Sequence, residues 1–304
     1  MKGSYDLVPG SEEEQGLINE IARARKNKSW SKLTICSMLS NVILLAGIVM
    51  IAVFRKPADI ECLRRTNAFS PILYDADIPL ERVKLNGTFF PATQPANFWR
   101  QEPNPALDEA WDALAETPAF LVTADEVRKA GRDPERAVRV PESWGLRPKG
   151  DPVYFAQMDG QHSIHCLNAL RMFAYFPYYF GHKWKSTAEM PVYQQNHLNH
   201  CVDMLRQNLM CSISTDIVTY EWVEANDTPQ PNFSIEKVCR SRDVIWDWLQ
   251  RHKLHLTHDQ DYHTPRPPPG QYQEVPASPY WLDLIKASRA KGVEVHNYIE
   301  QTEI

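Results

Sequence analysis

The longest apolar stretch of the chain lies at residues 33–54, where "LTICSMLSNVILLAGIVMIAVF" contains no charged residue. A helix needs roughly 20 apolar residues to cross the hydrocarbon core of a bilayer, and this stretch has that length. A cleaved signal peptide has a shorter apolar region, of about 7 to 15 residues, nearer to the first residue. The pattern therefore predicts a transmembrane helix at residues 33–54, after a polar and charged tail at residues 1–32.

Beyond the apolar stretch, the spacing of hydrophobic positions changes along the chain. Residues 55–105 are rich in Pro, Asn and aromatic residues and show no helical period, so we expect an extended stem with short strands there. Apolar residues at spacings of three and four then predict a helical domain at residues 106–263. Its helices are expected at residues 106–114, 123–131, 162–176, 196–211 and 242–252.

Local signals fix some of the element ends. Thr123 and Glu126 have the spacing of a capping box at a helix start, and Gly131 is suited to ending that helix. The Pro-rich run at residues 264–279 can neither be helical nor pair as a central strand, so it is expected to be an extended connector. It forms, with a last helix and tail, the segment 264–304. The chain is thus expected to be mainly α, with one N-terminal transmembrane helix and a lumenal helical domain that has a few short strands and long loops.

Charged residues beside the apolar stretch predict its orientation. Basic residues are more frequent before it than directly after it, which favours a cytosolic N-terminus. Those before it are Arg23, Arg25, Lys26, Lys28 and Lys32, and those directly after it are Arg55 and Lys56. The remainder of the chain would then be lumenal, as in a type II single-pass protein of the secretory pathway. Three Asn-x-Ser/Thr triplets on that side, at Asn86, Asn226 and Asn232, agree as candidate glycosylation sites.

Net charge and cysteine content narrow the classes of partner and compartment. The formal charge is −5, and Lys and Arg are dispersed along the chain, so nucleic acid is excluded as a partner. Five of the six cysteines lie beyond the apolar stretch. An oxidising lumen allows disulfides between them. The odd number leaves at least one thiol free or paired with another chain.

The most informative pattern is a His-x-x-His-Cys triad that occurs twice. It places His162, His165 and Cys166 in one predicted helix, and His197, His200 and Cys201 in another, in a chain with only ten histidines. Residues three and four apart share one face of a helix, so two such helices packed together would converge four imidazoles. Imidazole binds copper, iron, zinc and nickel. The alternative for these histidines is hydrogen bonding to backbone carbonyls, as for an isolated histidine.

The two motif cysteines have two open interpretations. Cys166 and Cys201 can act as thiolate ligands, which would favour copper or zinc. They can equally bridge the two helices as a disulfide and leave the histidines as the ligands. Cys211 and Cys239 are a second candidate bridge.

Other polar residues are weaker candidates for chemistry. Asp159 and Asp203 lie in or beside the motif helices and are candidates to orient imidazoles by hydrogen bonds. A further run of histidines begins at the last residue of the predicted helix 242–252. Successive steps of three residues wind around a helix, so we expect a solvated helix end and not a metal site. Its members are His252, His255, His258 and His263.

The motifs together resemble the fungal UstYa-like oxidase family. The resemblance covers roughly residues 60–250 and rests on "FSPILYDADIPLERVKLNGTFF", "LDEAWDAL", "HSIHCLNALR" and "NHLNHCVDMLRQNLMC". It implies an oxidase of secondary-metabolite, mycotoxin-type biosynthesis that acts on a ribosomally derived cyclic peptide by oxidative cyclisation, hydroxylation, desaturation or halogenation. It also implies that the four motif histidines form the site, and it allows a homo- or hetero-oligomer with a paralogous oxidase.

The sequence leaves three alternative hypotheses for the function. The first is a membrane-anchored, metal-dependent oxidase in which His162, His165, His197 and His200 hold copper, or iron as the alternative, beside a peptide or peptide-derived substrate. The second is a zinc hydrolase, which needs a glutamate beside the ligands as general base, and neither motif contains one. The third is a disulfide-bonded glycoprotein without catalysis, the partner of another oxidase subunit.

Overall fold

The structure is a computed structural model that describes residues 12–54, 58–89, 97–146, 151–257, 264–290 and 292. The chain divides into two compact units, Met1–Ala58 and Asp59–Ile304.

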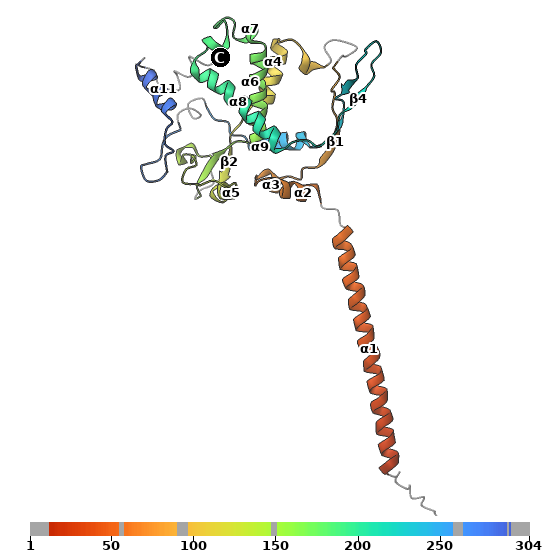
Figure 1. Ribbon diagram of the computed structural model, residues 1–304. Coiled ribbons are helices and arrows are strands. Elements are labelled where there is room, and N and C mark those ends of the chain that lie inside the picture. The colour runs from red at the N-terminus through yellow and green to blue at the C-terminus, as the bar shows by residue number, and fades with distance from the viewer. Residues whose placement is uncertain are drawn as a thin grey trace, which may run out of the picture. The chain divides into compact units, whose positions relative to one another are not determined.

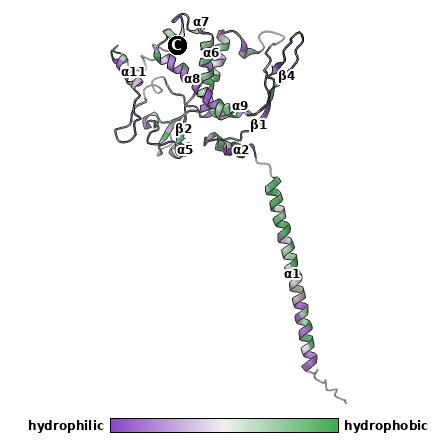
Figure 2. Cartoon of the chain, viewed as in Figure 1, coloured by the Kyte–Doolittle hydropathy of each residue, from purple (hydrophilic) through white to green (hydrophobic). Residues whose placement is uncertain are grey.

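The first unit consists of one long helix, α1, Glu12–Phe54. Its C-terminal half is the predicted apolar stretch, and every side chain described from Leu33 to Phe54 is exposed (Figure 2). Helical structure begins well before the apolar stretch, since Glu12, Glu13 and Glu14 form the first turn and suit the positive end of the helix dipole. Within the described residues α1 is the helix long and apolar enough to cross a membrane. Such a helix serves as a signal anchor or a signal sequence.

The second unit is mainly helical with short strands, as predicted. Its α-helices are α2 Asp59–Thr66, α3 Ile72–Asp75, α4 Pro105–Ala115, α5 Ala124–Lys129, α6 Asp159–Ala174, α7 Phe176–Tyr179, α8 Val192–Cys211, α9 Arg242–His252 and α11 Pro279–Ala290. Short 3-10 turns lie at Phe98–Arg100, Glu142–Trp144 and Thr187–Glu189. The strands are β1 Leu80–Lys84, β2 Phe120–Thr123, β3 Val153–Ala156, β4 Thr219–Glu221, β5 Gln230–Asn232 and β6 Glu236–Arg240.

The strands pair antiparallel across loops of very different length. In the described residues they form three two-stranded sheets, β1 with β6, β2 with β3, and β4 with β5. The β1–β6 pair joins distant parts of the sequence, with Leu80 opposite Arg240 and Lys84 opposite Glu236. It therefore ties the segment before the helical domain to the segment after α8.

The structure corrects the prediction of an extended stem at residues 55–105. This segment contains α2 and α3 as well as β1. Leu63, Ile72 and Leu73 are buried in the core of the second unit, so this segment is part of the folded domain. Helix α2 has acidic residues in its first turn and basic residues in its last, a signal that the sequence interpretation missed. Both helices are short, so packing against the core stabilises them.

The core of the second unit lies between α9, the β2–β3 pair and the short helices α2 and α3. Trp248 of α9 is 2% exposed and meets Phe120 of β2 edge-on, with ring centres 5.2 Å apart. Burial of two such aromatic rings contributes several kcal/mol of hydrophobic free energy, about 1.5–3 for each side chain. The β2–β3 pair is thereby held in place, and β3 leads through two residues into α6.

The predicted helix ends are confirmed where the sequence carried local signals. Thr123 caps α5 and its backbone N–H donates to Glu126, which completes the capping box. Gly131 follows with a φ of +74°, a conformation that suits glycine. Residues 264–278 form neither helix nor strand, as predicted for the connector, and α11 follows.

Candidate metal centre

Helices α6 and α8 pack side by side in the second unit (Figure 1). Their residues meet in opposite order, since His162 lies beside His200 and His165 beside His197, so the two helices are antiparallel. Near the C-terminal end of α8, the Asn208 side chain also joins the two helices. It donates to Ser163 Oγ at 2.7 Å and to Asp159 Oδ2 at 3.1 Å.

The four motif histidines come together between these helices. Ring centres are separated by 5.5 Å for His162 and His200, 5.7 Å for His165 and His197, and 6.2 Å for His162 and His165. All four imidazoles therefore form one connected cluster contributed equally by α6 and α8. His200 is exposed and the other three rings are partly buried, so the cluster opens to solvent on one side.

The spacing of the rings is close to that of a metal centre. Two imidazoles on a tetrahedral ion with metal–nitrogen bonds of about 2.1 Å have ring centres roughly 5 Å apart. The observed separations exceed this by an amount that side-chain rotation can remove. Within the described part of the chain, no three His, Cys, Asp or Glu side chains already stand at binding distance from one point. The residue types and backbone positions fit a metal ion, and the rings must close around it.

The electrostatic environment keeps two of these imidazoles neutral. Burial is the largest cause that lowers the pKa of His165 below its usual value of 6.5, and the charge of His162 adds to it. Burial likewise lowers the pKa of His197, with further contributions from His165, His200 and His162. A neutral imidazole has the free lone pair that a metal needs. His165 and His197 therefore carry a free lone pair near neutral pH.

The motif cysteines lie beneath the histidines and contact each other. Cys166 and Cys201 are fully buried, and the Cys201 thiol is hydrogen-bonded to Cys166. Burial, that hydrogen bond and the nearby Cys166 charge raise the pKa of Cys201 to about 12. Cys166 Sγ is 3.8 Å from His162 Nε2. Both sulfurs are thiols in the structure, in a position from which either a bridge or a ligand could be made.

The second cysteine pair and the glycosylation triplets lie away from the cluster. Cys211, exposed at the end of α8, and Cys239, half-buried in β6, are both free thiols, so a bridge between them stays a prediction. Asn226 lies in the turn between β4 and β5, where its Oδ1 accepts from Thr228 N and Oγ1. Asn232 donates to Glu221, and Asn86 stands in the loop after β1.

Among the weaker candidates that the structure describes, none contributes a ring or carboxylate to the four-histidine cluster. His252 stacks on Trp248 with ring centres 4.2 Å apart, and its Nδ1 lies 2.7 Å from the Trp248 carbonyl oxygen. His258 and His263 lie outside the described residues. Asp203 accepts from Arg206 and Gln207, which lower its pKa, and Asp159 accepts from Asn208. Asp159 thus takes part in the contact between α6 and α8, and Asp203 makes exposed contacts within α8, with a small contribution from the His200 charge to its lowered pKa.

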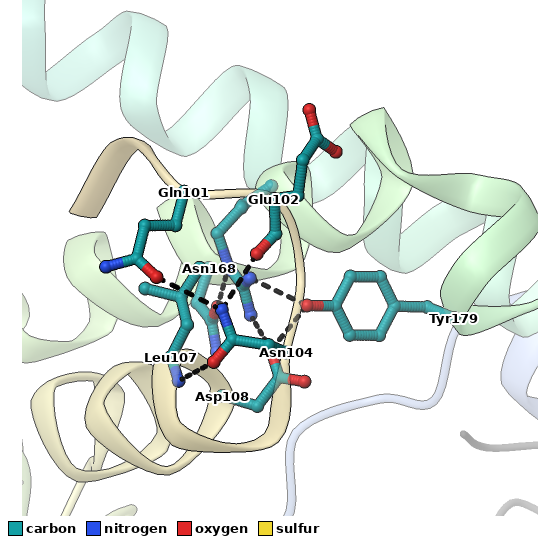
Figure 3. A network of polar contacts seen from close by, with 8 residues as sticks. Gln101, Glu102, Asn104, Leu107, Asp108, Asn168 and Tyr179 are labelled. Atoms are coloured by element: carbon teal, nitrogen blue, oxygen red, sulfur yellow. Dashed lines mark hydrogen bonds and ion pairs between the residues drawn. The ribbon is translucent and has the colours of Figure 1, made fainter. Parts of the chain in front are cut away.

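The sequence interpretation missed a partly buried polar network that contacts α6. Arg171 of α6 donates to Tyr179 Oη at 2.7 Å and to Asp108 Oδ1 at 3.0 Å, and the Tyr179 hydroxyl also donates to Asp108 (Figure 3). Burial and the Asp108 hydrogen bond raise the pKa of Tyr179 to about 12. The network joins α4, α6 and α7 and so fixes the helix that carries His162 and His165. Its members are far apart in sequence, and no spacing rule signals them.

The sequence interpretation also missed Tyr193, whose phenol ring lies next to the histidine cluster. Tyr193 lies one turn before His197 in α8, and the two ring centres are 6.5 Å apart. The i, i+4 spacing from the second motif is the signal that would have identified it.

Comparison with known proteins gives one family. A family profile described as "Mycotoxin biosynthesis protein UstYa" matches residues 21–252. The chain is 34% identical to the UstYa family oxidase aprY of Aspergillus flavus, over 81% of this chain and 75% of that protein. It is 24% identical to the UstYa family oxidase phomYc of Diaporthe leptostromiformis, over 75% and 86%. It is 23% identical to the chlorinase cctP2 of Talaromyces islandicus, over 93% and 82%. No solved structure matches the chain.

Proposed function

Because the chain belongs to the UstYa family of mycotoxin biosynthesis proteins, we propose that its four clustered histidines hold the redox metal of an oxidase. The chain is an oxidoreductase of fungal mycotoxin and secondary-metabolite biosynthesis, in a family whose named members are oxidases and a chlorinase. The observation that carries the proposal is the convergence of four imidazoles from two antiparallel helices.

Copper is the metal we propose, with iron as the alternative. A centre made of imidazoles suits both ions, whereas zinc has no redox chemistry and would imply hydrolysis. When bound, copper or iron would supply the electron and dioxygen chemistry of the reaction. His162, His165, His197 and His200 are the residues that would hold it.

The chain's own residues have separable roles around this centre. His165 and His197 are kept neutral by burial and so present lone pairs at neutral pH. Asn208 and the Arg171 network hold the two helices in register, which keeps the four rings within reach of one ion. The exposed side at His200 is where substrate would approach.

We propose that the substrate is a peptide or peptide-derived small molecule, in line with the resemblance of the motifs to the UstYa-like oxidase family. The protein is anchored by α1 with the second unit in the lumen of the secretory pathway, and it carries glycans at Asn86, Asn226 and Asn232. We propose a second copy or a paralogous oxidase as its partner there. Support comes from the apolar helix, the basic residues before it and the triplets after it.

Metal analysis of the purified protein tests the proposal. We expect stoichiometric copper or iron in the wild type and its loss in His165→Ala. His252→Ala is the matched control, because that imidazole stacks on Trp248 outside the cluster and its removal should leave metal bound. Stoichiometric zinc would support a hydrolase instead. Absence of any metal, with the fold intact by circular dichroism, would support the non-catalytic glycoprotein.

A further inference from the structure

A cavity of about 420 Å³ lies beside the β2–β3 pair. It is open to solvent, its wall combines apolar residues with the polar residues Gln157 and Thr264, and its volume falls in the size range of small-ligand pockets, roughly 300–1,000 Å³. The apolar residues of the wall are Ala119, Val138, Phe155, Ala156 and Leu256. Gln157 adds a polar amide at the rim, where its Nε2 donates to the Thr117 carbonyl.

The wall of the cavity is held by backbone hydrogen bonds. Phe155 N donates to Val138 O at 3.2 Å on one side of β3, and on the other side β3 pairs with β2. Leu254 N then donates to Ala119 O at 2.8 Å. The Phe155 ring rests against Trp144, with ring centres 5.9 Å apart. Backbone hydrogen bonds and strand pairing thus hold together four of the chain segments that line the cavity.

The cavity lies close to the histidine cluster along the chain. Its wall residues Phe155 and Ala156 end β3, and α6 begins at Asp159 with His162 in its first turn. From Gln157 to His162, two extended steps and one helical turn span at most about 12 Å between Cα atoms. An extended peptide advances about 3.3 Å per residue, so three to four residues cover that distance.

We propose that this cavity is the subsite that anchors the substrate of the histidine centre by a bulky apolar side chain. The proposal rests on the function proposed above and adds to it the chemistry and place of recognition. The apolar wall takes a leucine- to phenylalanine-sized side chain, and the Gln157 amide at the rim stands where peptide groups of the substrate would pass. The residue that is oxidised lies three or four positions from the anchored one.

Binding of a small probe to the full-length protein tests the subsite directly. The probe is N-acetyl-para-fluorophenylalanine amide, followed by fluorine NMR with the protein in lipid nanodiscs, and N-acetyl-aspartate amide is the polar competitor. Val138→Trp fills the cavity from its exposed side, and Leu256→Trp fills it from another wall. Val238→Trp is the matched control, because Val238 of β6 is as exposed as Val138, at 58% against 55%.

We expect the dissociation constant of the probe to rise at least about tenfold, or 1.4 kcal/mol, in both filled variants. It should stay unchanged in Val238→Trp, and the aspartate amide should not compete. Probe binding that is absent in the wild type, or unaffected by both fillings, overturns the subsite. Metal content measured on the same samples separates the two proposals. Filled variants should keep their metal, and a wild type without metal sinks the oxidase centre whatever the probe does.

Discussion

His165 and His197 face each other across the α6–α8 contact, with ring planes inclined by 28° and ring centres 5.7 Å apart. They come from two different copies of the same short motif, on two helices that run in opposite directions. Neither helix alone presents more than two imidazoles. The chemistry of the site therefore depends on the packing of α6 against α8 as much as on the histidines.

The first prediction is that the two halves of the cluster are not additive. His162→Ala with His165→Ala should abolish metal binding and turnover as fully as His197→Ala with His200→Ala, because two imidazoles fall short of the three or four protein ligands of a tight site. The fourfold variant should then cost little more. Elemental analysis and turnover measure this. Half the metal in each double variant would instead indicate two separate sites.

The second prediction concerns pH. The folded state lowers the pKa of His165 and His197 below the usual value of 6.5. At pH values between the lowered pKa and 6.5, the unfolded chain therefore binds more protons than the folded chain. Stability of the metal-free protein should therefore fall as pH drops from about 7.5 to about 5. Thermal melts of chelator-treated protein measure the fall. The variant with both histidines replaced by Ala should show a flatter profile, and an equal slope in both proteins would contradict this account.

The third prediction separates structure from ligation at the cysteines. Cys201→Ser places a hydroxyl in a fully buried, apolar position, so we expect a loss of about 1–3 kcal/mol in unfolding free energy. Metal content of the folded fraction should stay at the wild-type level, because a thiol with a raised pKa is a poor source of thiolate. Loss of metal without loss of stability would make Cys201 a ligand.

The state of the cysteines can be read directly. Mass spectrometry of the non-reduced protein distinguishes a Cys166–Cys201 bridge from two thiols by two hydrogens. Because Cys201 is hydrogen-bonded to Cys166, whereas Cys211 is exposed at the end of α8, we expect mild oxidation to form this bridge before any that involves Cys211.

The fourth prediction tests the network behind α6. Tyr179→Phe removes a hydroxyl that donates to Asp108 and accepts from Arg171, so unfolding free energy should drop by about 1–3 kcal/mol. Chemical denaturation measures the change. Tyr178→Phe, on the same helix and 53% exposed, is the control and should change stability by less than about 0.5 kcal/mol. Equal effects at both positions would refute the structural role of the network.

The fifth prediction concerns topology. If the second unit is lumenal, glycosidase should increase gel mobility, and Asn226→Gln should remove one step of that shift, since Asn226 stands in the turn between β4 and β5. The second unit should also be protected from protease in sealed microsomes. Digestion of that unit without a mobility shift would show the opposite orientation.

Much of the helical part of the site could be predicted from sequence because its signals are local. The spacing of His162 and His165 predicted a shared helix face, and Thr123 with Glu126 predicted a helix start. Each rule involves residues within one turn. The packing of α6 against α8 followed only from the rarity of the repeated motif, and the structure adds that the helices are antiparallel.

The parts that sequence did not predict depend on distant contacts. Leu63 and Ile72 lie in helices of eight and four residues, which form because the core covers them. Arg171 meets Asp108 from another helix, and neither residue belongs to a recognisable spacing pattern. The cavity wall likewise combines Val138, Phe155 and Leu256 from three segments. Tertiary packing determines these features.

The antiparallel packing gives the histidine cluster an approximate two-fold axis. Exchange of the two motifs converts the His162–His200 pair into His197–His165, and their ring separations of 5.5 and 5.7 Å are nearly equal. Burial breaks this symmetry, because His200 is exposed whereas its counterpart His165 is partly buried. The residues one turn before the two motifs also differ. Tyr193 stands beside His197, whereas the equivalent position before His162 is Met158, which packs against the hydrophobic core. A substrate that approaches from the exposed side therefore meets two motifs that differ in exposure and in this neighbouring residue.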